Sequence, residues 1–104
     1  MDLELAAMQI VGNAGESRSL CFEALSLAKK GEFEEAEKKL REAKEVFLKA
    51  HEVQTELITE EVEGKAPKIG LLMVHAQDHL MTSLLARDLI EEMVQLYKTL
   101  KKIK

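Results

Sequence analysis

The chain has 104 residues, 46% of them apolar and 4% aromatic, and a formal net charge of −4 at pH 7. This length and apolar content predict one compact domain over residues 1–104 and exclude a disordered tail. The negative charge is mild and unclustered. It disfavours nucleic acid as a partner, because a protein of that class needs a basic face to neutralise phosphates.

The few aromatic residues and the single proline, Pro67, predict an all-α fold rather than an all-β one. Cys21 is the only cysteine, so no intrachain disulfide can form, which fits the cytoplasm. The opening residues, MDLELAAM, lack the pattern of a signal peptide, and no apolar run is long enough to cross a membrane. We therefore expect a cytoplasmic protein that does not insert into the membrane.

The first predicted helix runs from Leu3 to Ala28 and ends before Gly31. Gly12 and Gly15 lie inside it and weaken it by up to about 1 kcal/mol each relative to alanine, so we expect another backbone or side chain to approach there closely. The residues of its predicted buried face follow alternating steps of four and three. They are Leu3, Ala7, Ile10, Ala14, Ser17, Cys21, Ala24 and Ala28.

The second predicted helix runs from about Glu32 to Val62, and the GKAPK segment around Pro67 ends it. Its predicted buried face again follows steps of three and four, with Gln54 as the polar exception. The members are Phe33, Ala36, Leu40, Ala43, Phe47, Ala50, Gln54 and Leu57.

The third predicted helix, roughly Ile69 to Lys101, carries two apolar stripes. The first would face the other two helices of an antiparallel three-helix bundle. It consists of Leu72, Ala76, His79, Ser83, Ala86, Ile90, Met93, Tyr97 and Leu100. The second consists of Leu71, Val74, Asp78, Met81 and Leu85. A single bundle leaves this second stripe in water, and an exposed apolar patch usually marks an interface, so the pattern predicts a homo-oligomer.

Residues 75–79 read HAQDH, and this segment carries the chemistry of the chain. On a helix His75, Asp78, His79 and Thr82 share one face, while Gln77 points elsewhere. The spacing H-x-x-D-H is similar to a zinc motif, but zinc chemistry needs a third ligand and a longer carboxylate. The alternative is a hydrogen-bonded core histidine at 79 and a surface histidine at 75.

Asp78 lies between apolar residues of the second stripe. In a symmetric oligomer its copies would meet and repel each other unless they shared protons or a cation. Oxygen ligands completed by water suit Mg²⁺, so we expect one shared, structural Mg²⁺ ion on the symmetry axis.

His75 is the candidate nucleophile. Near pH 7 a neutral imidazole can attack a phosphoryl group with one nitrogen while a hydrogen bond orients the other. The chain has no P-loop glycine pattern, so a phosphoryl group must come from another protein and leave to another.

The stretch MVHAQDHLMTSLLARDLIEE, Met73 to Glu92, closely resembles the phosphohistidine segment of the enzyme IIA component of the lactose/cellobiose class of the bacterial sugar phosphotransferase system. The likeness continues through AGESRSL, GEFEEA and AHEVQT, and so spans nearly the whole chain. Ala76 is nearer to the cellobiose and diacetylchitobiose members than to the lactose members. Arg18, His51 and Gln54 also match family positions, without an assigned role.

The resemblance implies that His75 accepts phosphate on Nε2 from the carrier protein HPr and passes it to the IIB component, for uptake of a disaccharide. It also implies a homotrimer with Asp78 at a metal ion on its axis. For His79 it implies a role in orienting His75 or contacting the phosphate, and for Gln77 a contact across the interface. We expect Met73 and Met81 to form an apolar rim for partners. A metal-binding or purely structural helical oligomer is the alternative.

Overall fold

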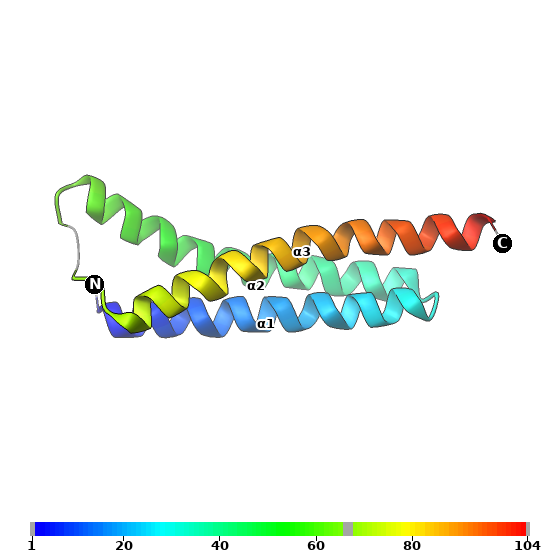
Figure 1. Ribbon diagram of the computed structural model, residues 1–104, viewed down its shortest axis with the longest axis horizontal. Coiled ribbons are helices and arrows are strands. Elements are labelled where there is room, and N and C mark those ends of the chain that lie inside the picture. The colour runs from blue at the N-terminus through cyan, green and yellow to red at the C-terminus, as the bar shows by residue number, and fades with distance from the viewer. Residues whose placement is uncertain (1, 66–67, 104) are drawn as a thin grey trace.

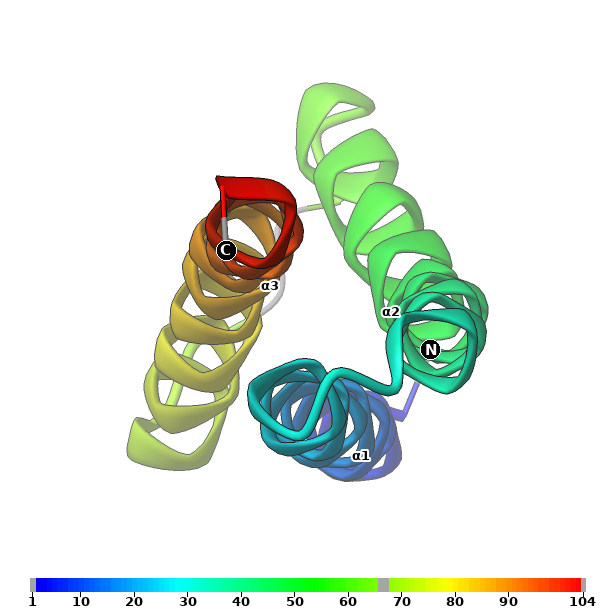
Figure 2. The same cartoon turned by 90° about the vertical axis from the view of Figure 1, so that its right-hand side faces the viewer.

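The computed structural model describes residues 2–65 and 68–103, which form three helices: α1 (Leu3–Lys29), α2 (Phe33–Val62) and α3 (Leu71–Ile103). Figure 1 shows that α1 and α3 run in one direction and α2 runs back between them. Seen along the bundle, the three helices occupy the corners of a triangle (Figure 2). The predicted all-α fold of three helices with antiparallel neighbours is confirmed.

Helix α1 begins where the side chain of Asp2 accepts hydrogen bonds from the backbone amides of Glu4 and Leu5. It ends at Lys29, and Gly31 follows with a φ of 82°, the left-handed conformation typical of a glycine just past a helix. Its predicted face is buried, except that Leu3 is only half-buried. The expectation at Gly12 and Gly15 is wrong within the subunit, because a Cβ at either position would meet no atom within 4 Å.

Helix α2 has Glu34 and Glu35 in its first turn, where negative charge complements the helix dipole. It ends at Val62, and Gly64 follows with a φ of 80°. The predicted helix end therefore lies where expected. Pro67, which was part of that expectation, lies outside the described residues.

Helix α3 starts two residues later than predicted, and the predicted buried stripe is partly wrong. Leu72, Met93 and Leu100 are exposed, at 42%, 41% and 45% of their surface. The buried face consists instead of Met73, Ala76, Leu80, Ser83, Ile90 and Val94. Apolar residues occur all around this helix, so the spacing alone did not fix which side meets α1 and α2.

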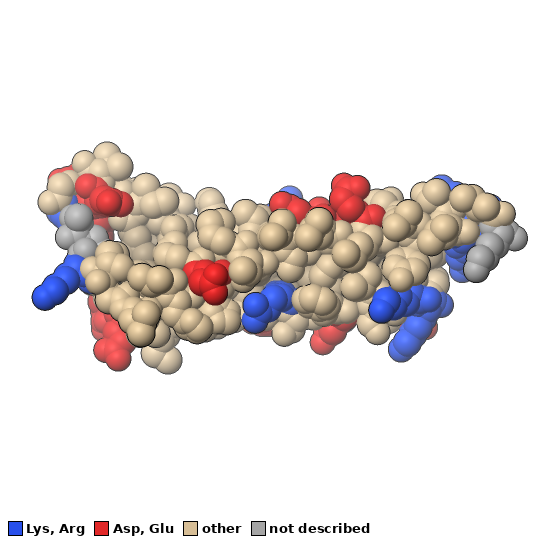
Figure 3. All heavy atoms as spheres, in the orientation of Figure 1, with Lys and Arg blue, Asp and Glu red and all other residues tan. Residues whose placement is uncertain are grey.

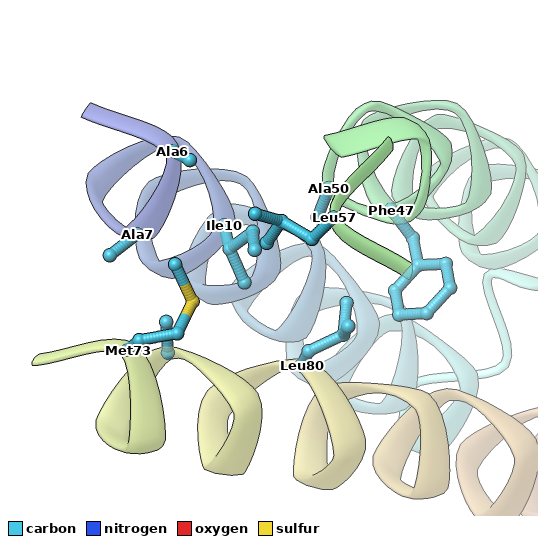
Figure 4. Close-up of a cluster of buried hydrophobic side chains, with 9 residues drawn as sticks. Ala6, Ala7, Ile10, Phe47, Ala50, Leu57, Met73 and Leu80 are labelled. Carbon is cyan, nitrogen blue, oxygen red and sulfur yellow. The ribbon is translucent and has the colours of Figure 1, made fainter. Parts of the chain in front are cut away.

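The core has two clusters, one at each end of a long bundle that measures 57 × 20 × 19 Å. Figure 4 shows the first cluster, in which Ile10, Leu57, Met73 and Leu80 point toward one another from all three helices. Between the clusters, the buried hydroxyl of Ser17 donates to the carbonyl of Ala43 at 2.7 Å. Ser83 donates in the same way to Ala14 at 2.9 Å, so no hydroxyl is left unsatisfied there.

Alanine is the most frequent buried residue in the described part of the chain, because α1 packs closely against both α2 and α3. The buried alanines are Ala6, Ala7, Ala14, Ala24, Ala28, Ala36, Ala43, Ala50 and Ala76. Many of the large apolar side chains are exposed instead. Most of the exposed ones are on α3, and Figure 3 shows the broad uncharged surface that results, with charged side chains only in isolated places.

The exposed apolar side chains of α3 continue the predicted second stripe along the whole helix. Together with Asp78 they form what we call the outer stripe: Leu71, Val74, Asp78, Met81, Leu85, Leu89, Met93, Leu96, Leu100 and Ile103. The steps are three or four residues throughout, so these side chains lie on one side of α3. None of the described helices has a stretch long and apolar enough to cross a membrane.

Candidate functional site

His75 and His79 form a pair on the first turns of α3. Four residues separate them, so both side chains project from the same side of the helix. Their Nε2 atoms are 3.0 Å apart, and the rings meet edge to face at a centroid distance of 4.4 Å. The His75 side chain is exposed and the His79 side chain is half-buried. The predicted pairing of the two histidines is thus present in the structure, with His75 outermost.

A hydrogen bond between the two Nε2 atoms needs one proton. If His79 carries it, the lone pair of His75 Nε2 accepts this hydrogen bond and becomes available to an electrophile as that bond is released. Nδ1 of His79 is then the unprotonated nitrogen, and this atom is buried without a hydrogen-bond partner among the described residues. With this tautomer, the buried nitrogen without a partner is a hydrogen-bond acceptor and not a donor.

Asp78 and Thr82 lie on the same part of α3 as the pair but act differently. The Thr82 hydroxyl donates to the backbone carbonyl of Asp78 at 2.9 Å and is also 3.3 Å from that of His79, so it serves its own helix. The Asp78 carboxylate is exposed on the outer stripe and has no ion pair within the described ranges 2–65 and 68–103. This carboxylate is therefore available to a positively charged group outside the subunit.

The surface beside His75 is an open depression of about 700 Å³. Leu71, Leu72 and Val74 line it together with His75 and Asp78. Its shape and apolar lining suit the docking of another protein better than the enclosure of a small substrate. Sequence reasoning had not assigned Leu72 to this rim. Met81 is exposed as expected for a rim residue, but Met73 is buried at 4% exposure, so its predicted place in the rim is wrong.

Gln77 lies on the other flank of α3, facing α2. It forms a reciprocal pair of hydrogen bonds with Gln54, each 2.6 Å long, and its amide nitrogen is 3.6 Å from the sulfur of Met73. The amide of Gln77 is therefore used within the subunit, to hold α2 against α3. Its contact across a subunit interface remains a prediction.

One subunit does not provide a metal site among its described residues, because no three histidine, cysteine, aspartate or glutamate side chains converge. His51 lies on α2 with its ring 6.3 Å from that of Phe47, and it does not join the histidine pair. The zinc interpretation of H-x-x-D-H lacks its third ligand. Asp78 fits a different arrangement, in which several copies of one exposed carboxylate supply hard oxygen ligands.

The half of the bundle that carries the site has no basic residue on its helices. Neither lysine nor arginine occurs in residues 3–17, 50–62 or 71–86. The helices of this half therefore place no lysine or arginine side chain beside His75.

Comparison with known proteins matches residues 5–98 to the family model described as "PTS system, Lactose/Cellobiose specific IIA subunit". The lichenan-specific phosphotransferase enzyme IIA component of Bacillus subtilis is 45% identical over 97 residues, which are 93% of this chain and 88% of that protein. The crystal structure of the cellobiose-specific enzyme IIA from Bacillus anthracis is 40% identical. It superposes with a TM-score of 0.94 and covers 98% of this chain and 94% of its own.

A third similar structure is the Escherichia coli chitobiose IIA component, solved in solution as a complex with HPr. It is 42% identical, with a TM-score of 0.83, and covers 97% of this chain and 98% of its own. The similarity thus extends over the entire bundle and includes the segment that carries the two histidines.

Proposed function

Because the chain belongs to the lactose/cellobiose-specific IIA family of the sugar phosphotransferase system, we propose that it is a phosphoryl carrier with His75 as its acceptor. It takes the phosphoryl group from phospho-HPr and passes it to a IIB component, for uptake and phosphorylation of a disaccharide of the cellobiose, chitobiose or lactose type. The exchange takes place in the cytoplasm. The complex of the Escherichia coli relative with HPr supports the choice of donor.

The exposed side chain of His75, with its Nε2 3.0 Å from that of His79, is the observation that carries this proposal. The lone pair of His75 attacks phosphorus as the bond from phosphorus to the donor nitrogen breaks, and the reverse exchange delivers the group to the next carrier. The N–H of His79 then turns from the His75 nitrogen to a phosphoryl oxygen. His79 thereby orients the acceptor and holds the transferred group.

We further propose that three subunits assemble in parallel through their outer stripes. A stripe that spans all of α3 and alternates in steps of three and four is typical of helices that pack around a common axis. Covering it would remove the large apolar side chains from water, which the alanine-rich core of one subunit does not do. His75 would then lie beside the seam between subunits, open to docking proteins.

In this trimer Asp78 would bring three carboxylates to the axis, where a shared Mg²⁺ ion would offset their repulsion. Gln77 stays in the proposed site as a residue of the subunit boundary whose position is fixed by Gln54. Replacing Asp78 with leucine extends the apolar stripe, so the trimer should persist in sedimentation. Dissociation of the Asp78→Leu variant would contradict the axial position of this side chain.

The carrier function is tested by incubating the protein with phosphoenolpyruvate, enzyme I and HPr. We expect an acid-labile phosphate on the wild type and none on the His75→Gln variant. His51→Gln is the matched control, since His51 is also exposed but lies apart on α2, and it should accept phosphate normally. A wild-type chain that gains no phosphate would instead support a structural or metal-binding oligomer.

A further inference from the structure

We propose that α1 provides a second contact between copies of this chain, in which Arg18 of one subunit forms an ion pair with Asp88 of the next. The proposal rests on the parallel trimer proposed above. It adds to that assembly a surface outside α3, and it gives Arg18 a role in holding neighbouring subunits.

An apolar groove of about 280 Å³ runs between α1 and α3. Phe22 and Leu25 line it from α1, and Leu85, Leu89 and Met93 line it from α3. The last three side chains also belong to the outer stripe. A copy of the chain that covers the stripe therefore reaches the groove as well, and Phe22, 55% exposed in the single subunit, would be buried by it.

Arg18 lies on the same flank of α1 as this groove. It precedes Phe22 by four residues and Leu25 by seven, so the three side chains share one side of the helix. Arg18 is half-buried, and it has no hydrogen bond or ion pair with any residue that the structure describes. A guanidinium held at the edge of an apolar groove without a partner favours a negative partner from outside the subunit.

Asp88 lies on the opposite flank of α3. It follows Gln77 by eleven residues, which is three helical turns, and Gln77 marks the flank that faces α2 because it bonds to Gln54. Asp88 is exposed and also lacks an ion pair in the described part of the chain. The two unpaired charges of opposite sign thus stand on either side of the outer stripe.

Both charges lie at the same height along the bundle. The hydrogen bond from Ser83 to the Ala14 carbonyl sets α1 level with α3 at that point, and both helices run in the same direction (Figure 1). Arg18 is four residues beyond Ala14, and Asp88 is five residues beyond Ser83. In a closed ring of parallel copies, each subunit presents one flank to one neighbour and the other flank to the other. Arg18 of one copy then faces Asp88 of the next.

Gly15 gives independent support, because it precedes Arg18 by three residues and so lies on the same flank. A Cβ there would meet nothing within 4 Å in the subunit, so no internal contact requires glycine. Close approach by a neighbouring copy would account for a residue that otherwise weakens α1.

The test is a charge-reversal cycle measured by sedimentation across a range of protein concentrations. Arg18→Glu and Asp88→Arg alone should each raise the trimer dissociation constant by about tenfold or more, because three like-charge contacts form per trimer. The combined variant should return it to within about threefold of the wild type. The neutral pair Arg18→Gln and Asp88→Asn serves if a reversed variant fails to fold by circular dichroism.

Lys49→Glu and Glu45→Arg are the matched controls, because both side chains are exposed on α2, and neither should change the dissociation constant. A stable wild-type trimer in which the combined variant shows no recovery would overturn the proposed ion pair and leave the trimer and the carrier function standing. A wild type that stays monomeric but accepts phosphate would overturn the ion pair and the trimer together, not the carrier role.

Discussion

The two halves of the bundle are built differently, although the same three helices form both. In the half that carries His75, the end of α2 leans away from α3 (Figure 2), and the helices contain no lysine or arginine. In the other half, ion pairs join α1 to α2 through Glu23 and Lys39, and α2 to α3 through Glu37 and Lys98. The comparison distinguishes a closed half, whose helices are joined by these ion pairs, from an open half around His75, where α2 and α3 diverge.

Phe47 lies where the two halves meet. Its ring is 4% exposed in the cluster of the open half, and the guanidinium of Arg87 lies 4.8 Å from the ring centroid. Phe47→Ala should lower the free energy of unfolding by about 3–5 kcal/mol, because it leaves a cavity and removes the cation–π contact. Urea unfolding at fixed protein concentration measures this loss.

The control is Phe47→Leu, which keeps most of the apolar volume and should cost about 1 kcal/mol. Equal losses of unfolding free energy for the two variants would show that the apolar volume of Phe47 does not contribute to packing where the two halves meet.

The pH dependence of the unfolding free energy tests whether Cys21 is buried in the closed half. Burial raises the pKa of its thiol from 9.0 to about 11, with Arg87 opposing the shift and Glu91 adding to it. The unfolded chain loses this proton first as pH rises, so the stabilisation is complete below pH 9 and is lost between pH 9 and about 11. The loss amounts to about 3 kcal/mol at most.

The measurement is the difference in unfolding free energy between wild type and Cys21→Ala across that range, because contributions common to both proteins cancel in the difference. The variant should show a shallower decline. Parallel curves would mean that the thiol is not sealed inside the closed half.

His79 tests the open half. His79→Ala should slow phosphoryl transfer from HPr to His75 by up to about a hundredfold, because the donor to the phosphoryl oxygen is lost. His79→Gln keeps an N–H at a similar reach and should recover part of the rate. Both variants should unfold like the wild type. If the alanine variant transfers phosphate at the normal rate, the short contact between the two rings has no part in the reaction.

The smallest effect is expected for Lys39→Ala, which removes the 3.3 Å ion pair with Glu23. Both side chains are partly exposed, so the loss should be about 0.5 kcal/mol or less. Urea unfolding of this variant beside Leu40→Ala, an apolar neighbour packed on the core, compares the two kinds of contact. A larger loss of unfolding free energy for Lys39→Ala than for Leu40→Ala would mean that the ion pair, not apolar packing, holds the helices of the closed half together.

The sequence predicted the helices and the histidine pair well, because both depend on local spacing. The face of α1 was clear, since small and apolar residues recur along it without interruption at steps of three and four. The face of α3 was not, because Leu72 and Met73, or Met93 and Val94, are equally apolar neighbours. Only packing against the other helices selects Met73 and Val94 for the core.

Contacts between different helices could not be predicted from the sequence, for a similar reason. The hydrogen bonds between Gln54 and Gln77 depend on the position of α2 relative to α3 along the bundle axis. The residue spacing within one helix does not specify that position. Gly12 and Gly15 were expected to admit a neighbour, but a Cβ at either position meets nothing within 4 Å inside the subunit.

The alanine-lined interior also shapes how this protein responds to temperature. Alanine side chains each bury little apolar area, so unfolding one subunit should change the heat capacity less than unfolding a chain of equal length with larger core side chains. A smaller heat-capacity change makes the free energy of unfolding vary less steeply with temperature. The free energy of unfolding should therefore vary less between cold and warm conditions than that of such a chain.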